Sequence, residues 1–186
     1  MQRVAILAFL AALHAGAHAA CQSGLAERLN DKIEPRRALL HELTVCEAWH
    51  GQLGRSVVVL PTPGNSPGTL DLEVLVVQQP DNGNSERTTI VARHRQTVAN
   101  GGADSMAVSD IEFDTARYRL SAQWRSFGLR VFRRSTTTDQ PASSESLSLY
   151  ALGHGNELRL LLDEFEIRRE RGQCRAGCGG RFVKPE

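Results

Sequence analysis

The chain is poor in several residue types, and each shortage limits what the protein can be. Only two tryptophans, two tyrosines and four cysteines occur among its 186 residues. The formal net charge is +1, so neither nucleic acid nor an anionic lipid surface is an expected partner. No apolar run reaches the about 20 residues that a membrane-spanning helix needs, and no membrane span is predicted. Hydrophobic residues still make up 41% of the chain, which is enough for a packed core.

The N-terminus has the pattern of an export signal. Arg3 supplies a positive charge, Val4–Leu13 is apolar, and Ala17–Ala19 offers small residues to a signal peptidase. We therefore expect residues 1–19 to be a cleaved signal peptide and residues 20–186 to form a single domain. The expected location is the periplasm or the extracellular space.

Export also decides how the cysteines are interpreted. In an oxidising compartment, disulfides are the expected state of Cys21, Cys46, Cys174 and Cys178. Four cysteines allow three pairings. A lipid anchor on Cys21 is an alternative, but His18 stands where a lipoprotein signal has an aliphatic residue. A zinc site built from the four thiolates is disfavoured, because thiolates do not persist in an oxidising compartment.

Hydrophobic periodicity predicts a mainly β fold after a short helical start. A helical pattern covers Leu25–Ile33. Pro35 is a suitable first residue for a second helix, whose apolar face would run from Leu39 through Leu43 to Cys46. Apolar or alternating segments then predict six or seven strands, at Val57–Leu60, Leu70–Val76, Thr88–His94, Ile111–Asp114, Phe127–Phe132, Leu147–Leu152 and Leu158–Ile167. We expect an antiparallel β-sandwich or a small barrel with one or two short N-terminal helices.

Two local patterns refine this prediction. Gly153–Asn156 joins two alternating segments and predicts a hairpin turn. The apolar positions of the last strand change face at Asp163–Glu164, which predicts a bulge or a break there. Thr97–Val108 and Ser135–Ser146 are polar and predict long loops suited to recognition.

Six segments of the chain carry a resemblance to a known family: Cys46–His50, Leu70–Val76, Phe113–Leu120, Phe127–Val131, the Ser146–Leu162 hairpin and Cys178–Phe182. In order and spacing they resemble a family of exported bacterial proteins of unknown function. The resemblance covers most of the mature chain and implies a fold and a location, but no reaction. The resemblance also implies a Cys46–Cys178 disulfide and an additional Cys21–Cys174 disulfide.

A fainter similarity links the chain to periplasmic lysozyme inhibitors. Those proteins also place a long Ser/Gly loop and a terminal hairpin on a small β scaffold. Their inhibitory loop motif has no clear counterpart in this sequence.

Arginines are the candidate binding residues. Arg117, Arg119 and Arg130 are predicted to bind an anion, because guanidinium groups bind carboxylates well. Trp49 is expected in the core and Trp124 at the end of a strand. The histidines have no metal-ligand spacing, and neither a metal nor a cofactor is predicted.

Three patterns suggest other chemistry, but each has a simpler interpretation. The acidic residues of Asp163–Glu166 could be the paired carboxylates of a hydrolase, although the arginines that follow favour a solvated edge strand. Gly64–Gly68 matches the pattern of a nucleophile elbow, but Pro67 lacks the N–H that an oxyanion hole needs. Asp81–Glu86 offers oxygen ligands without the register of a calcium loop.

The sequence therefore favours a non-enzymatic binding protein of the bacterial cell envelope. Its partner would be an envelope protein or a glycan, and inhibition of a hydrolase is one form of this hypothesis. One alternative is a hydrolase whose site is not recognisable from sequence. Another is a structural envelope component that acts through an exposed sheet edge.

Overall fold

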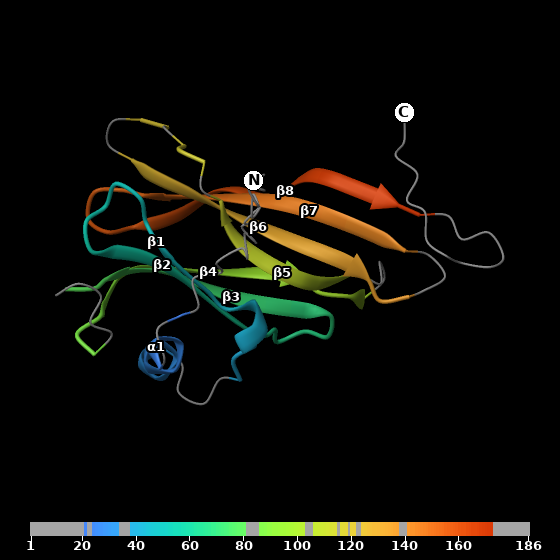
Figure 1. The fold of residues 1–186 in the computed structure, drawn as a ribbon, viewed down its shortest axis with the longest axis horizontal. Coiled ribbons are helices and arrows are strands. Elements are labelled where there is room, and N and C mark those ends of the chain that lie inside the picture. The colour runs from blue at the N-terminus through green and yellow to red at the C-terminus, as the bar shows by residue number, and fades with distance from the viewer. Residues whose placement is uncertain are drawn as a thin grey trace, which may run out of the picture.

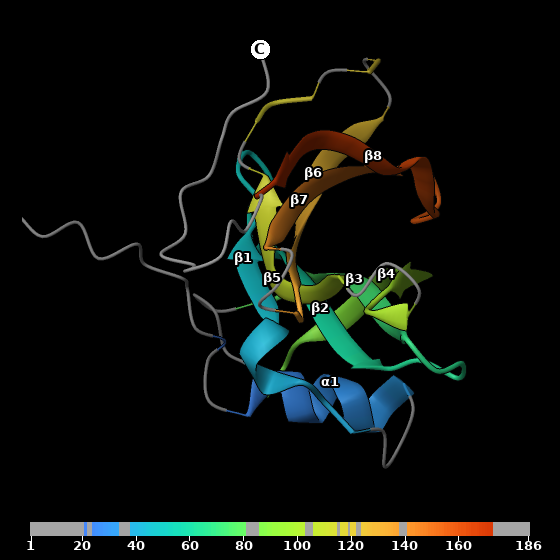
Figure 2. The same cartoon turned by 90° about the vertical axis from the view of Figure 1, so that its right-hand side faces the viewer.

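The computed structural model describes residues 21, 24–33, 38–80, 86–102, 106–114, 116–118, 120–121, 124–137 and 141–172. These residues form two four-stranded antiparallel sheets that pack face to face as a sandwich and do not close into a barrel (Figures 1 and 2). Sheet A has the order β1 (Val45–Ala48), β2 (Arg55–Pro63), β3 (Thr69–Gln78) and β4 (Thr89–Ala99). Sheet B has the order β5 (Met106–Asp114), β6 (Arg125–Ser135), β7 (Ala142–Leu152) and β8 (Leu158–Arg171). The predicted mainly β sandwich is confirmed.

The main core lies between the inner faces of the two sheets. It includes Leu72, Val74 and Val76 of β3 together with Phe127 and Leu129 of β6, each at most 1% exposed. Burial of one such side chain contributes about 1.5–3 kcal/mol. This packing holds the two sheets together as one rigid scaffold.

Helix α1 (Leu25–Ile33) covers the outer face of sheet A (Figure 2). Its residues Leu25 and Leu29 form a second apolar cluster with Val58 and Leu75 of the sheet. Strands β2 and β3 are therefore buried on both faces, which explains why their sequences are nearly continuous apolar runs. The predicted helix is confirmed with the same bounds. Among the described residues, no helix is long and apolar enough to cross a membrane.

The second predicted helix is wrong within the described residues. A short 3₁₀ turn, η1 (His41–Leu43), and strand β1 take its place, while residues 34–37 lie outside the described part. Strand β1 pairs along the edge of β2, from Val45 opposite Val59 to Ala48 opposite Ser56. Pairing with a sheet edge satisfies the backbone as well as a helix would, so tertiary context overrides the helical spacing.

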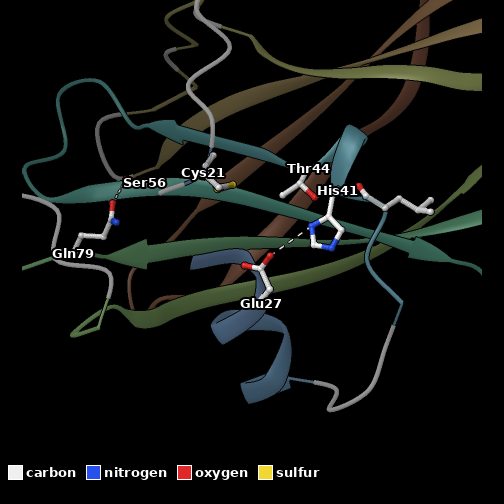
Figure 3. Close-up of a disulfide and its surroundings, with 8 residues drawn as sticks. Cys21, Glu27, His41, Thr44, Ser56 and Gln79 are labelled. Carbon is white, nitrogen blue, oxygen red and sulfur yellow. Dashed lines mark hydrogen bonds and ion pairs between the residues drawn. A yellow bond between two sulfur atoms is a disulfide. The ribbon is translucent and has the colours of Figure 1, made fainter. Parts of the chain in front are cut away.

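Cys21 and Cys46 form a disulfide, with their Cα atoms 5.1 Å apart (Figure 3). The expected pairing of Cys46 with Cys178 and of Cys21 with Cys174 is therefore wrong. Both bonded cysteines pack against the cluster on the outer face of sheet A, which brings them together. Cys174 and Cys178 lie outside the described residues. A sulfur held in a disulfide cannot carry a thioether-linked lipid, so this bond disfavours the lipid anchor on Cys21.

The β7–β8 hairpin matches two sequence predictions. The Gly153 N–H donates to the carbonyl oxygen of Glu157 at 3.0 Å across the predicted turn. Further along β8 the pairing shifts, because Leu162 lies opposite Leu149 but Phe165 lies opposite Leu147. The break falls at the predicted place, where Glu164 adopts a φ of 42°.

The two predicted recognition loops are shorter than expected. Strand β4 continues to Ala99 and β5 begins at Met106, while β6 ends at Ser135 and β7 begins at Ala142. Much of the polar sequence at these places therefore belongs to strand ends. The longest connections between strands join β3 to β4 and β5 to β6.

Candidate functional site

A cavity of about 610 Å³ lies at the end of the sandwich where the β1–β2 turn meets the β5–β6 connection. Both connections lie toward the left in Figure 1. This volume falls within the range of about 300–1,000 Å³ that is usual for small-molecule sites. The β1–β2 turn contributes Trp49, His50, Gly51 and Gln52 to the lining, and the remaining lining residues come from positions 113–127.

Aromatic rings form much of the cavity wall. Trp49 meets Phe127 edge to face, with ring centroids 5.1 Å apart, and Phe113 stacks on Phe127 at 5.8 Å. Trp49 is 7% exposed and belongs to the main core, so the prediction of a core tryptophan is confirmed. Because Phe127 is also part of this core, the wall is continuous with the rigid interior.

Trp124 stands immediately before β6, as expected for an aromatic residue at the end of a strand. The guanidinium carbon of Arg159 lies 5.4 Å from the centre of its ring, which is cation–π geometry. A Cβ atom at Gly153 would come within 3.2 Å of the indole, so glycine in the β7–β8 turn lets this ring pack closely. Both tryptophans of the chain line the cavity.

The β5–β6 connection is anchored to sheet B through Asp114, the last residue of β5. Its carboxylate accepts hydrogen bonds from the Ala116 N–H (2.8 Å), the Tyr118 hydroxyl (2.8 Å) and Nε of Arg130 (2.9 Å). Nη1 of Arg130 also donates to Glu145 at 2.6 Å. The connection is therefore fixed at Ala116 and Tyr118, on either side of Arg117.

Gly128 makes this anchorage possible. A Cβ atom at position 128 would lie 3.0 Å from Asp114 Cβ, 3.0 Å from Leu147 Cδ1 and 3.1 Å from Tyr118 Cε2. The Tyr118 ring therefore lies against the sheet at a point where no side chain separates the two. Glycine is required here by close approach and not by a positive φ.

The protonation states at this anchor follow from its contacts. Burial raises the pKa of Asp114, but the hydrogen bonds from the Ala116 N–H, Tyr118 and Arg130 outweigh burial and lower the pKa overall. Burial and the hydrogen bond to Asp114 raise the pKa of Tyr118 to about 12. At neutral pH the anchor therefore consists of an ionised carboxylate and a neutral phenol.

The predicted anion-binding arginines have different environments. Arg117 lines the cavity and is exposed. Arg130 is held between Asp114 and Glu145, two carboxylates of the chain itself. Arg119 lies outside the described residues. Arg125, which was not among the three candidates, also lines the cavity.

The acidic residues considered for a hydrolase lie elsewhere and have partners. Asp163 accepts a hydrogen bond of 2.5 Å from Gln96, at the side of the sandwich where β4 meets β8. Glu164 pairs with the buried Arg133, and Glu166 pairs with Arg169. None of these carboxylates lines the cavity.

Tyr150 belongs to the same polar network between the sheets. Its hydroxyl donates to Oε1 of Gln96, and Gln96 in turn donates to Ser148 at 3.1 Å. Burial, together with the nearby charges of Asp163 and Glu164, raises the pKa of Tyr150. A buried network whose members are hydrogen-bonded to one another fixes the relative position of the sheets, and we assign it a structural role.

The other considered patterns do not form a catalytic or metal site in the described part of the chain. His50 lines the cavity, whereas His41 lies 3.6 Å from Glu27 on the helical side. No group of three potential metal ligands occurs within the described ranges. Gly64–Gly68 connects β2 to β3 and is followed directly by a strand, so it is not a nucleophile elbow.

Sequence reasoning missed most of the cavity lining. Gln52, Ser121 and Ser126 are ordinary polar residues in the sequence, and they converge only when the two connections meet. Ser126 carries a specific signal in the structure, because its Oγ is buried and has no hydrogen-bond partner among the described residues. Such an atom is costly unless another group pairs with it.

Comparison with known proteins gives no relative: no protein-family model, no curated protein and no solved structure matches this chain. The family resemblance drawn from the sequence therefore stays a prediction.

Proposed function

We propose that this chain is an exported, non-enzymatic binding protein and that the cavity between the β1–β2 turn and the β5–β6 connection is its ligand site. The observation that carries the proposal is a small-molecule-sized cavity set against a rigid core. Binding sites are commonly built from loops on such a scaffold.

The chemistry of the lining favours binding over hydrolysis. Among the described residues, the lining contains five aromatic side chains, two arginines and several neutral polar groups, but no aspartate or glutamate. A hydrolase of the carboxylate type would need two acidic groups at the scissile bond. The buried carboxylate of Asp114 accepts hydrogen bonds from Tyr118 and Arg130.

Native mass spectrometry tests the proposal. The mature protein is incubated with the low-molecular-weight fraction of a bacterial envelope extract, and a bound small molecule is expected as a mass increment. Gln52→Trp fills the cavity and should abolish the increment. Leu53→Trp is the matched control, because Leu53 is the next residue of the same turn and is 100% exposed. An increment that persists in Gln52→Trp, or none in the wild type, would contradict the proposal.

A protein partner is the second candidate, and it is favoured by two exposed leucines near the cavity. Leu53 is 100% exposed in the β1–β2 turn, and Leu120 is 48% exposed in the β5–β6 connection. Exposed apolar side chains on neighbouring connections are typical of protein contacts. A hydrolase inhibitor would use such a surface.

Pull-down from envelope extract separates the two candidates. A protein that is retained by the wild type and by Ile167→Ser, but lost with Leu53→Ser and Leu120→Ser, would favour the protein partner. Ile167 is the control because it is 40% exposed and lies toward the end of β8, on the far side of the β8 register shifts from Arg159 and Trp124. If the protein is retained by all three variants as by the wild type, the protein-partner candidate is contradicted.

A further inference from the structure

We propose that the cavity binds a saccharide that carries a carboxylate group, an inference that rests on the proposed binding function. Three features of the lining favour such a ligand: its arginines without a carboxylate partner, its aromatic rings and its neutral polar side chains.

The two arginines of the lining differ from those arginines of the described residues that pair with carboxylates. Six others are bound to carboxylates of the chain: Arg95, Arg130, Arg133, Arg159, Arg168 and Arg169. Arg117 and Arg125 line the cavity, and the side chains of both lack a carboxylate partner within the described residues. Since the lining also contains no acidic residue, the charge that the cavity can neutralise is negative. Guanidinium groups bind carboxylates through paired, charge-assisted hydrogen bonds.

The aromatic walls favour a ligand with a ring. Phe113, Tyr118 and Trp124 are half-buried in the lining, and the core residues Trp49 and Phe127, 7% and 1% exposed, support them. The Tyr118 hydroxyl donates a hydrogen bond to Asp114. The ring of Tyr118, and not its hydroxyl, is therefore available to a ligand. Flat aromatic side chains offer large, rigid apolar surfaces at a small cost in conformational entropy.

The neutral polar groups favour a hydroxyl-rich ring over an aromatic acid. His50 and Gln52 lie in the same lining, and no described residue forms a hydrogen bond with either side chain. A ligand that covered these groups without offering them hydrogen bonds would leave them unsatisfied. The hydroxyl groups of a sugar can pair with these side chains, whereas a plain aromatic carboxylate cannot.

Tryptophan fluorescence provides a direct measurement, because both tryptophans of the chain line the cavity. The protein is titrated with glucuronate, galacturonate, N-acetylmuramate and N-acetylneuraminate. The neutral sugars glucose, galactose and N-acetylglucosamine and the aromatic acid 4-hydroxybenzoate serve as comparisons, and calorimetry confirms each affinity. At least one acidic sugar should bind about tenfold or more tightly than its neutral counterpart, since hydrogen bonds to charged groups are among the strongest.

Substitutions locate the binding. Arg117→Gln and Arg125→Gln should each weaken the acidic sugar about tenfold and leave weak binding of neutral sugars unchanged. Arg134→Gln is the matched control, because Arg134 is also exposed and unpaired but lies near the far end of β6 from Arg125. All three sites are exposed, so the folded state should be unaffected.

The outcomes separate this inference from the function on which it rests. Equal binding of acidic and neutral sugars, preference for 4-hydroxybenzoate, or an equal loss in Arg134→Gln would each overturn the saccharide–carboxylate assignment. If no acidic sugar binds, but native mass spectrometry shows a bound small molecule that Gln52→Trp abolishes, the ligand class is wrong and the binding function stands. If the increment is absent as well, both proposals fail.

Discussion

The two sheets of the sandwich differ in what covers their outer faces. In sheet A, α1 packs on the outside, and β3 is buried at eight consecutive positions from Leu70 to Val77. In sheet B, burial alternates along β6 and β7, and no helix in the described part of the chain packs on the outer face. The covered sheet therefore contributes mainly stability. The open sheet has room on its outer face for the Asp114–Arg130 anchor, which positions one wall of the cavity.

The outer edge of sheet B is formed by β8. The β8 edge carries Phe165 and Ile167, which are 58% and 40% exposed. Pairing shifts along β8 and the exposed Glu166 and Arg168 interrupt this edge. Bulges and charges of this kind prevent edge-to-edge association, and they weaken the alternative of a structural component acting through an exposed edge.

The largest expected effect concerns the disulfide on the covered side. Replacing both cysteines, as Cys21→Ser/Cys46→Ser, removes a link across a sequence separation of 25 residues. The loss should be about 3.5 kcal/mol in the free energy of unfolding by the chain-entropy model. Denaturant titration measures the loss, and non-reducing peptide mapping should recover a Cys21–Cys46 peptide. Recovery of a Cys46–Cys178 peptide instead would contradict the structure.

The next effect compares one leucine from each outer face. Leu29→Ala opens a cavity between α1 and sheet A, where Leu29 is 1% exposed, and should cost about 2–5 kcal/mol. Leu161→Ala makes the same chemical change at a position that is 50% exposed on β8, and should cost about 0.5 kcal/mol or less. Denaturant titration compares the two variants. Similar losses would mean that the two outer faces do not differ as described.

A smaller effect is expected at the anchor of the open face. Gly128→Ala places a Cβ about 3 Å from the side chains of Asp114, Leu147 and Tyr118, which should cost about 1–3 kcal/mol through overpacking. The displaced Tyr118 should also disturb the cavity and change tryptophan fluorescence. A stable variant with wild-type fluorescence would show that close packing at Gly128 does not position the connection.

Acid titration tests the charge of the same anchor. The pKa of Asp114 is lowered in the folded state from its ordinary value of 3.8, so ionised Asp114 stabilises the fold above that value. This stability is lost as the pH falls through the lowered pKa. Asp114→Asn should flatten the acid limb of a plot of unfolding free energy against pH. If the variant loses unfolding free energy at low pH as the wild type does, carboxylates other than Asp114 cause the acid dependence of stability.

The smallest effect compares the two tyrosines, which are the only ones in the chain. The pKa of Tyr118 is raised to about 12, and burial also raises the pKa of Tyr150 inside the core. Ultraviolet absorbance should show Tyr118 ionising first, with Tyr150 following only as the protein unfolds. Tyr118→Phe should remove the first step. A tyrosine that titrates near its ordinary value of 10.0 would contradict the burial of both rings.

Sequence reasoning succeeded where the pattern is local. Helix Leu25–Ile33, the Gly153–Asn156 turn and the irregularity at Asp163–Glu164 follow from periodicity and turn chemistry, which act over a few residues. It failed for β1, because the apolar spacing from Leu39 to Cys46 suits a helix, and only the free edge of β2 makes it a strand. It also failed for the cysteine pairing, which depends on how α1 lies on sheet A.

The sequence by itself determined the β-rich class, the helix Leu25–Ile33 and the expectation of disulfides, since these depend on composition and short-range periodicity. Only the tertiary structure decided the Cys21–Cys46 bond and the cavity. Trp49, Arg117 and Trp124 are far apart or unremarkable in sequence, and they become one lining when the β1–β2 turn and the β5–β6 connection meet at the same end of the sandwich. The physical reason is that packing between sheets brings distant residues together, and no local pattern encodes that distance.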